Sequence, residues 1–131
     1  MKYMIDTDIC VLIMNGVEQA KKMFEFKRKE GVCISSITFS ELEYGVCKSK
    51  KYEQNKNNLF KFLTLVDIFN YDDNAALEYG WVRAKLEERG NVIGPLDTLI
   101  AAHALSLGLT VVTNNTREFS RVEGLACEDW L

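Results

Sequence analysis

Three short apolar stretches in this chain each lead, within a few residues, to an acidic side chain. The stretches are residues 2–5, 32–34 and 110–113, and the acids that follow them are Asp6, Glu41 and Glu118. A fourth acid, Asp97, opens an apolar segment of helical length. Because the carboxyl ends of parallel strands lie at one edge of a sheet, carboxylates far apart in sequence can meet in one pocket there. The pattern therefore favours a parallel α/β fold with an acidic pocket.

Extended and helical segments alternate along the chain. The predicted strands are residues 2–5, 32–35, 66–69 and 110–113. The predicted helices are residues 8–14, 17–30, 39–47, 53–65, 73–90 and 95–107, and the long one is capped by Asp72 or Asp73 and turns Ala76, Tyr79, Val82 and Leu86 inward. Strands that are apolar throughout are typical of a sheet covered on both faces. We therefore predict one three-layer α/β/α domain over residues 1–131, with a central parallel sheet of four to five strands.

Composition fits a compact domain with its own core. The chain has 131 residues, of which 47% are hydrophobic, and a single proline. No apolar run reaches the roughly 18 residues that a membrane-spanning helix needs, and no secretory signal is recognisable. Four cysteines without a C-x-x-C pair and one histidine do not form a zinc pattern. We therefore expect a cytoplasmic protein with no membrane partner and no structural zinc.

The charge is unevenly distributed along the sequence. Residues 1–65 hold 11 Lys and Arg against 8 Asp and Glu, whereas residues 66–131 hold 5 against 11. The basic surplus centres on residues 21–29 and 48–51. A polyanion could use these clusters to approach an acidic site, although solvated helix faces are the commoner reason for such clusters. Charge alone therefore does not assign a nucleic-acid function.

Gathered carboxylates have a chemical consequence. They repel one another and resist joint ionisation unless a cation neutralises them. Oxygen ligands without a histidine cluster favour Mg²⁺ or Mn²⁺ over zinc. The acids therefore predict a hydrolase that depends on a divalent metal.

Two of the acids also have structural explanations near the start of a helix. Asp6 could cap the helix that follows it, although Thr7 and Asp8 already serve that need. Glu41 occupies the last position of a capping box that begins at Thr38. The sequence therefore favours a functional role for Asp6 and leaves both roles open for Glu41.

The other two acids lie in the second half of the chain. Asp97 would be stabilised by the dipole of the helix that Pro95 begins, which is a structural reason for an acid at this position. The residues after it are nearly all apolar, however, so this end of the helix should be buried. A buried acid is rarely explained by structure alone, and we therefore favour a functional role for Asp97. Glu118 could be a solvated residue in a short turn capped by Thr116. His103 lies six residues after Asp97 and thus off that helix face. We therefore interpret His103 as a packing or solvated residue.

Together, the four acidic segments resemble the motifs of PIN-domain ribonucleases, and specifically of VapC-type toxins from bacterial toxin–antitoxin pairs. The matching segments are Met4–Asp8, Ser36–Gly45, Ile93–Ala104 and Leu109–Phe119. They follow in the order of the family and span essentially the whole chain. Two positions differ: Asp8 stands where many relatives have Asn, and Asn115 where many have a fourth Asp, with Glu118 available one turn later.

The resemblance implies Mg²⁺- or Mn²⁺-dependent cleavage of RNA that leaves a 3′-hydroxyl and a 5′-phosphate. The catalytic and metal-binding residues that it implies are Asp6, Glu41, Asp97 and Glu118, with support from Thr7, Asp8, Thr113 and Asn115. It also implies a homodimer and a cognate VapB-like antitoxin, whose C-terminal segment lies along the active-site groove. The enteric branch, which the chain resembles most, implies tRNA as substrate, in particular the anticodon loop of initiator tRNA, and hence inhibition of translation.

Two other functions fit parts of the sequence. Asp6-Thr7-Asp8 after an apolar strand looks like the D-x-D opening of haloacid-dehalogenase-type phosphatases, in which Asp6 would be the nucleophile. However, Cys10 occupies a position where that motif has Thr or Ser. Alternatively, the chain could be a non-catalytic protein with the PIN fold that uses its acids only to hold an antitoxin or RNA.

Overall fold

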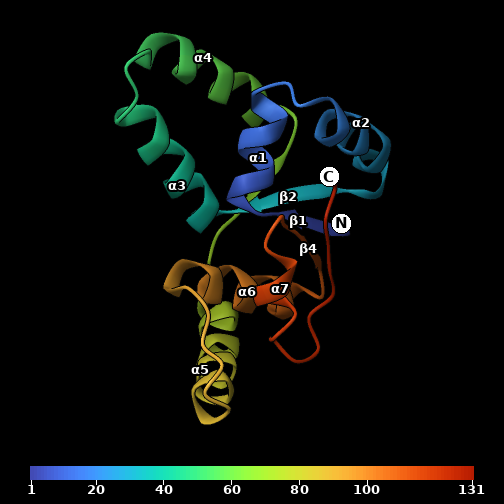
Figure 1. Ribbon diagram of the computed structural model, residues 1–131, viewed down its shortest axis with the longest axis vertical. Coiled ribbons are helices and arrows are strands. Elements are labelled where there is room, and N and C mark those ends of the chain that lie inside the picture. The colour runs from blue at the N-terminus through green and yellow to red at the C-terminus, as the bar shows by residue number, and fades with distance from the viewer.

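The computed structural model describes residues 1–131 and shows a central sheet between two layers of helices (Figure 1). The strands are β1 Tyr3–Ile5, β2 Val32–Ser35, β3 Asp67–Phe69, β4 Thr110–Val112 and β5 Cys127–Glu128. The helices are α1 Thr7–Met14, α2 Glu18–Lys27, the 3-10 turn η1 Arg28–Glu30, α3 Ser36–Cys47, α4 Tyr52–Leu63, α5 Asp73–Glu88, α6 Pro95–Leu107 and α7 Thr116–Phe119. The strands pair in parallel in the order β3-β2-β1-β4-β5. The predicted α/β fold with a four- to five-stranded parallel sheet is confirmed.

Successive strand residues point alternately into two hydrophobic cores. In β1, Tyr3 and Ile5 pack with residues of α1–α4, whereas Met4 packs with residues of α5 and α6. In β2, Ile34 joins the first core and Cys33 the second. Because a strand places neighbouring side chains on opposite faces, burial of both faces requires apolar residues at every position. This explains why the strands appear in the sequence as uninterrupted apolar runs.

On one side of the sheet, α5 and α6 pack closely against each other. Asp72 caps α5, since its side chain accepts a hydrogen bond from the backbone of Ala75 at 3.0 Å. Ala75 is buried and Ala76 is exposed, so the predicted inward position was wrong by one residue. With 16 residues, α5 is the longest helix. No helix in the structure combines the length and the apolar composition needed to cross a lipid bilayer.

On the other side, α3 begins earlier than predicted. Its cap is Ser35, whose hydroxyl accepts a hydrogen bond from the backbone of Ile37 at 3.1 Å. The predicted capping box from Thr38 to Glu41 was therefore wrong. The physical reason is that β2 leads into α3 without a loop, which places Thr38 inside the first turns, where it is fully buried.

Candidate active site

Asp6 and Thr113 lie where the chain reverses direction across the sheet. From β1 the chain builds outward through β2 and β3, and then returns to place β4 on the opposite side of β1. The crevice at such a reversal is where ligands bind in open parallel sheets. Asp6 follows β1 and Thr113 follows β4, and the Thr113 hydroxyl donates to Asp6 Oδ2 at 2.8 Å. The fold thus joins two residues that are 107 positions apart.

Asp6 is held from a second side by the helix that it precedes. Its Oδ1 accepts a hydrogen bond from the backbone of Thr7 at 2.8 Å, which makes Asp6 the cap of α1. The prediction that Thr7 or Asp8 provides this cap was wrong. Only 5% of Asp6 is exposed, so its carboxylate orientation is set by two hydrogen bonds and by burial.

Glu41 reaches the same place from the second turn of α3. Its Oε1 accepts a hydrogen bond from the Thr7 hydroxyl at 2.6 Å. The same hydroxyl lies 3.4 Å from that of the buried Thr38. Because Glu41 bonds to the residue next to Asp6 in the chain, Thr7 links the two acids. The tertiary partner of Glu41 is therefore a site residue, and not the amide of a helix cap.

Asp97 and Glu118 come from the helices on the other side of the sheet. Asp97 lies in the first turn of α6 and is half-buried, close enough to Glu118 and Glu41 for their charges to act on it. The amide of Asn115 hydrogen-bonds to Glu118 and also favours the ionised form of Asp97. Asn115 therefore connects the last two acids.

Asp8 connects the start of α1 to the segment that follows β4. Its Oδ2 accepts a hydrogen bond from the backbone of Asn114 at 3.1 Å, and its Oδ1 accepts one from the backbone of Ile9. These bonds hold the start of α1 against the segment that carries Asn115. Asp8 therefore has a local structural role at the start of α1.

The electrostatics of the cluster are dominated by burial and like charge. The pKa of Asp6 is raised to about 7, first by burial and then by the charge of Asp8. The pKa of Asp97 is raised to about 6, first by burial and then by the charges of Glu118 and Glu41. No lysine or arginine forms an ion pair with any of these acids. The cluster therefore lacks a protein cation to neutralise it.

This donor set fits a hard divalent cation, although it is not arranged as a finished coordination sphere. All the candidate ligands are oxygen atoms, which Mg²⁺ and Mn²⁺ prefer. No three of the Asp, Glu, His or Cys side chains lie together closely enough to hold one ion as they stand. The carboxylates instead bond to Thr7, Thr113 and Asn115. Ion binding would therefore require small side-chain rotations away from these hydroxyl and amide partners.

His103 is a buried packing residue, one of the two alternatives that the sequence suggested. Its Nδ1 lies 2.8 Å from the hydroxyl of Ser35, and its ring meets that of Tyr71 edge-on at 5.5 Å. Burial lowers its pKa. His103 thus ties α6 to the start of α3.

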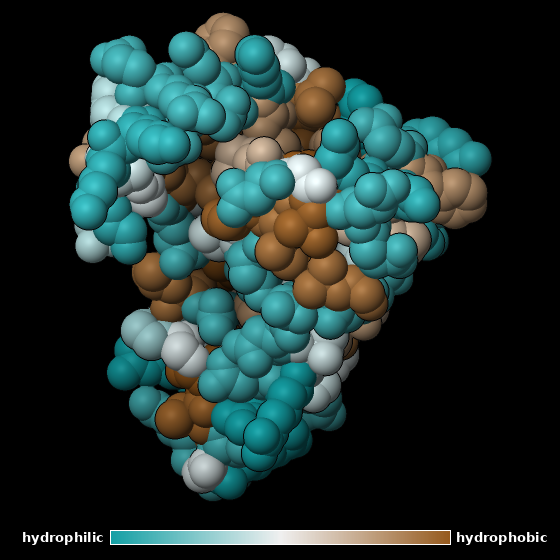
Figure 2. Space-filling model, turned by 45° about the horizontal axis from the view of Figure 1, so that its top comes forward, coloured by the Kyte–Doolittle hydropathy of each residue, from teal (hydrophilic) through white to brown (hydrophobic).

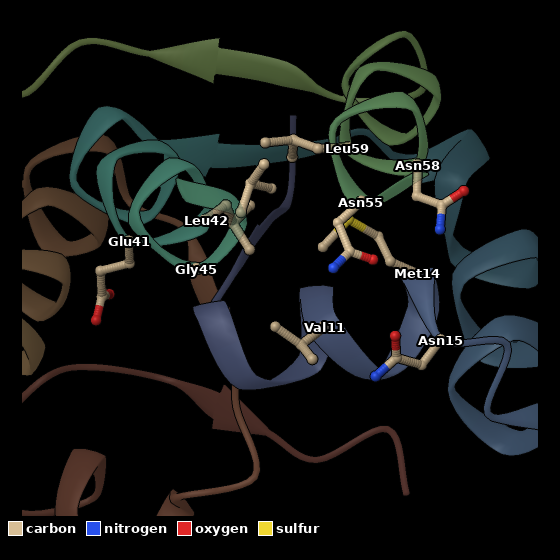
Figure 3. Close-up of a pocket in the computed structure, with 10 residues that line it drawn as sticks. Val11, Met14, Asn15, Glu41, Leu42, Gly45, Asn55, Asn58 and Leu59 are labelled. Atoms are coloured by element: carbon tan, nitrogen blue, oxygen red, sulfur yellow. The ribbon is translucent and has the colours of Figure 1, made fainter. Parts of the chain in front are cut away.

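A groove of about 200 Å³ lies between α1, α3 and α4 (Figure 3). Its lining combines apolar residues with amides: Val11, Met14, Leu42, Val46 and Leu59, with Asn15, Asn55, Asn58, Gly45 and Glu41. Glu41 stands at one end, so the groove leads to the acidic cluster (Figure 3). This groove could not be predicted from the sequence, because its lining comes from three helices and the periodicity of each helix does not reveal how they pack together.

Comparison with known proteins places the chain in a well-populated group. The family model of the PIN domain matches residues 3–125. The chain is 44% identical over 131 residues to the tRNA(fMet)-specific endonuclease VapC of Shigella flexneri, covering 99% of this chain and 98% of that protein. It is 41% identical over 132 residues to ribonuclease VapC2 of Rickettsia felis, with 99% and 98% covered.

Solved structures give the same grouping. One is VapBC2 from Rickettsia felis bound to a DNA fragment from its promoter, with a TM-score of 0.95 and 41% identity over 100% of both chains. Another is DNA-bound VapBC from Salmonella typhimurium, with a TM-score of 0.94 and 41% identity over 100% of this chain and 99% of that one. Both similarities extend over all the elements that carry the acids.

Proposed function

This chain belongs to the PIN-domain family, and we propose that it is a ribonuclease toxin of the VapC type that cleaves tRNA and thereby inhibits translation. The observation that carries the proposal is the acidic cluster. A carboxylate that follows β1 and carboxylates from α3, α6 and α7 gather at one edge of the sheet, and no lysine or arginine side chain neutralises them. Relatives matched over nearly their full length are VapC ribonucleases and support RNA as the substrate, and a tRNA(fMet)-specific endonuclease among them supports initiator tRNA.

Mg²⁺ or Mn²⁺ is the cofactor that the donor set supports. Asp6 and Asp97 would hold it, with Glu41 and Glu118 as the further acidic ligands. When bound, such a cation supplies a water molecule of lowered pKa and polarises a phosphate oxygen. It would also relieve the repulsion and desolvation that raise the pKa values of Asp6 and Asp97.

The neighbouring polar residues orient the acids. Thr113 and the backbone of Thr7 fix the two oxygens of Asp6, and the Thr7 hydroxyl holds Glu41. Asn115 holds Glu118 on the side of Asp97. In the metal-free protein these bonds hold the carboxylates at one end of the sheet, so that only small side-chain rotations separate them from a metal-binding arrangement.

A VapB-like antitoxin is the partner that the groove supports. The related solved structures are VapBC complexes. Apolar side chains of an antitoxin segment would pack on Val11, Leu42 and Leu59, and a cationic side chain would face Glu41 at the acidic end. The resemblance to VapC-type toxins also supports a homodimer.

The proposal is tested by incubating the purified chain with labelled initiator tRNA and mapping the new 5′ ends. We expect site-specific cleavage with Mg²⁺ or Mn²⁺ and none with EDTA. Asp97→Asn should abolish the cuts, whereas Asp73→Asn, at an exposed acid of α5, should leave them unchanged. Failure of the wild-type chain to cut any purified tRNA would contradict the proposal.

The same assay separates the alternatives. Binding of tRNA without cleavage in either cation would support a non-catalytic protein. Hydrolysis of a small phosphate ester would support a phosphatase, but Cys10 argues against that function. The position where the phosphatase motif has a hydroxyl is a fully buried thiol, whose pKa is raised well above its usual value, first by burial.

A further inference from the structure

One face of α3 carries three side chains of different chemistry in a row. Glu41, Tyr44 and Lys48 are spaced three and four residues apart, which places them on one helix face. With a rise of about 1.5 Å per residue, the row extends for about 10 Å from the acidic site. The tyrosine and lysine on this face, Tyr44 and Lys48, are here called the α3 stripe.

Tyr44 is not explained by the packing of the domain. It is 65% exposed, and its only aromatic or charged contact is with Lys48, whose Nζ lies 4.9 Å from the ring centroid. On another face of the same helix, Glu43 forms an ion pair with Lys56 of α4 at 2.7 Å. That pair links α3 to α4.

The segment from Tyr44 to Tyr52, which contains the α3 stripe, carries only positive charges. Residues 44–52 contain Lys48, Lys50 and Lys51 and no acid, and none of these lysines forms an ion pair. Hydrophilic residues gather over the upper left of the molecule in Figure 2, where α3 and α4 lie in Figure 1. A positive region beside an acidic site can attract a polyanion that the acids alone would repel.

We infer that the α3 stripe is a binding subsite for single-stranded RNA next to the cleavage site, where a base stacks on Tyr44 and a phosphate binds Lys48. The inference rests on the proposed function. Proteins bind single strands by combining aromatic rings, which stack with bases, and cationic side chains, which follow the backbone. An exposed ring with a lysine beside it supplies both, and a row of about 10 Å from Glu41 to Lys48 suits a nucleotide near the scissile phosphate.

The test measures affinity for labelled initiator tRNA by fluorescence anisotropy, in an Asp97→Asn background with EDTA so that no cleavage occurs. We expect Tyr44→Ala to weaken binding by about 10-fold at every salt concentration, and Tyr44→Phe to bind like the parent because the ring remains. Lys48→Ala should weaken binding and also reduce the slope of log K against log salt by about one, because one phosphate contact is lost.

Matched controls come from the opposite pole of the molecule. Trp81→Ala removes an aromatic ring that is 71% exposed, and Lys85→Ala removes an exposed lysine, both on α5 (Figure 1). Neither should change tRNA affinity or its salt dependence. Because Tyr44 and Lys48 are exposed, their variants should melt at the temperature of the parent, which circular dichroism checks.

The outcomes are distinguishable. If the parent binds tRNA and both stripe variants bind equally well, the inference is overturned while the proposed function stands. If the variants lose affinity only for an antitoxin peptide, the α3 stripe is a protein-binding surface and the inference is again overturned. If the wild-type chain neither binds nor cleaves tRNA, the proposed function and the inference fall together.

Discussion

Replacing Asp6 by Asn should stabilise the metal-free protein at neutral and alkaline pH. The pKa of Asp6 is raised to about 7 from the usual 3.8 by burial and by Asp8. Each pKa unit corresponds to about 1.4 kcal/mol, so the ionised carboxylate costs the folded state about 4 kcal/mol above pH 7. Asn can still cap α1, but it reverses the hydrogen bond with Thr113, which costs about 1 kcal/mol. The expected net gain is therefore about 2 to about 3 kcal/mol.

The pH dependence of the stability difference shows whether ionisation of Asp6 is its cause. Below pH 3.8 the carboxyl is protonated in both folded and unfolded chains, so its ionisation contributes nothing. As the pH rises from 3.8 to about 7, the unfolded chain ionises first, and stability is lost progressively. The advantage of Asp6→Asn should therefore grow over this range and then stay constant.

Urea unfolding at about pH 4 and about pH 8, both with EDTA, measures this difference. Asp73→Asn is the control because Asp73 is exposed, and it should change the free energy of unfolding by less than about 0.5 kcal/mol at either pH. An Asp6→Asn protein that is no more stable than wild type at about pH 8, or equally stabilised at both values, would refute the reasoning.

Three further predictions follow from the same contacts. Asp97→Asn should lower the rate of tRNA cleavage at least about a hundredfold while the fold is kept, and near-normal single-turnover rates would contradict its assignment. Mn²⁺ affinity, measured by calorimetry, should rise as the pH increases through about 6 and about 7, where Asp97 and Asp6 lose their protons; a flat profile would exclude both as ligands. His103→Ala should destabilise the protein by about 2 to about 4 kcal/mol in urea unfolding, since it leaves a buried cavity and removes the partner of Ser35, and an unchanged midpoint would show that this contact contributes little.

Several features of the fold followed from the sequence because they depend on local patterning. The apolar runs over residues 2–5, 32–34 and 110–113 identified β1, β2 and β4, since strands buried on both faces need apolar residues throughout. Asp97 at the mouth of a buried helix was recognisable for the same reason. These signals were enough to predict the sheet and the acids at its edge.

Other features could not be predicted from the sequence because local residue patterns allowed more than one arrangement or left no pattern. Ser35 and Thr38 can both cap a helix, and only the direct passage from β2 into α3 selected Ser35. Ala75 and Ala76 are the same residue type, and only the packed structure shows that Ala75 is buried and Ala76 exposed. The two-residue β5 is too short to leave a pattern, and its pairing with β4 alone defines it.

The sequence by itself determined that this chain forms a parallel α/β domain with acids at the ends of its strands. Only the tertiary structure decided how those acids behave: that Thr7 joins Asp6 to Glu41, that Thr113 binds Asp6 from across the sheet, and that their pocket raises the pKa of Asp6. The physical reason is that desolvation and charge repulsion depend on distances between groups remote in sequence, and folding alone sets those distances.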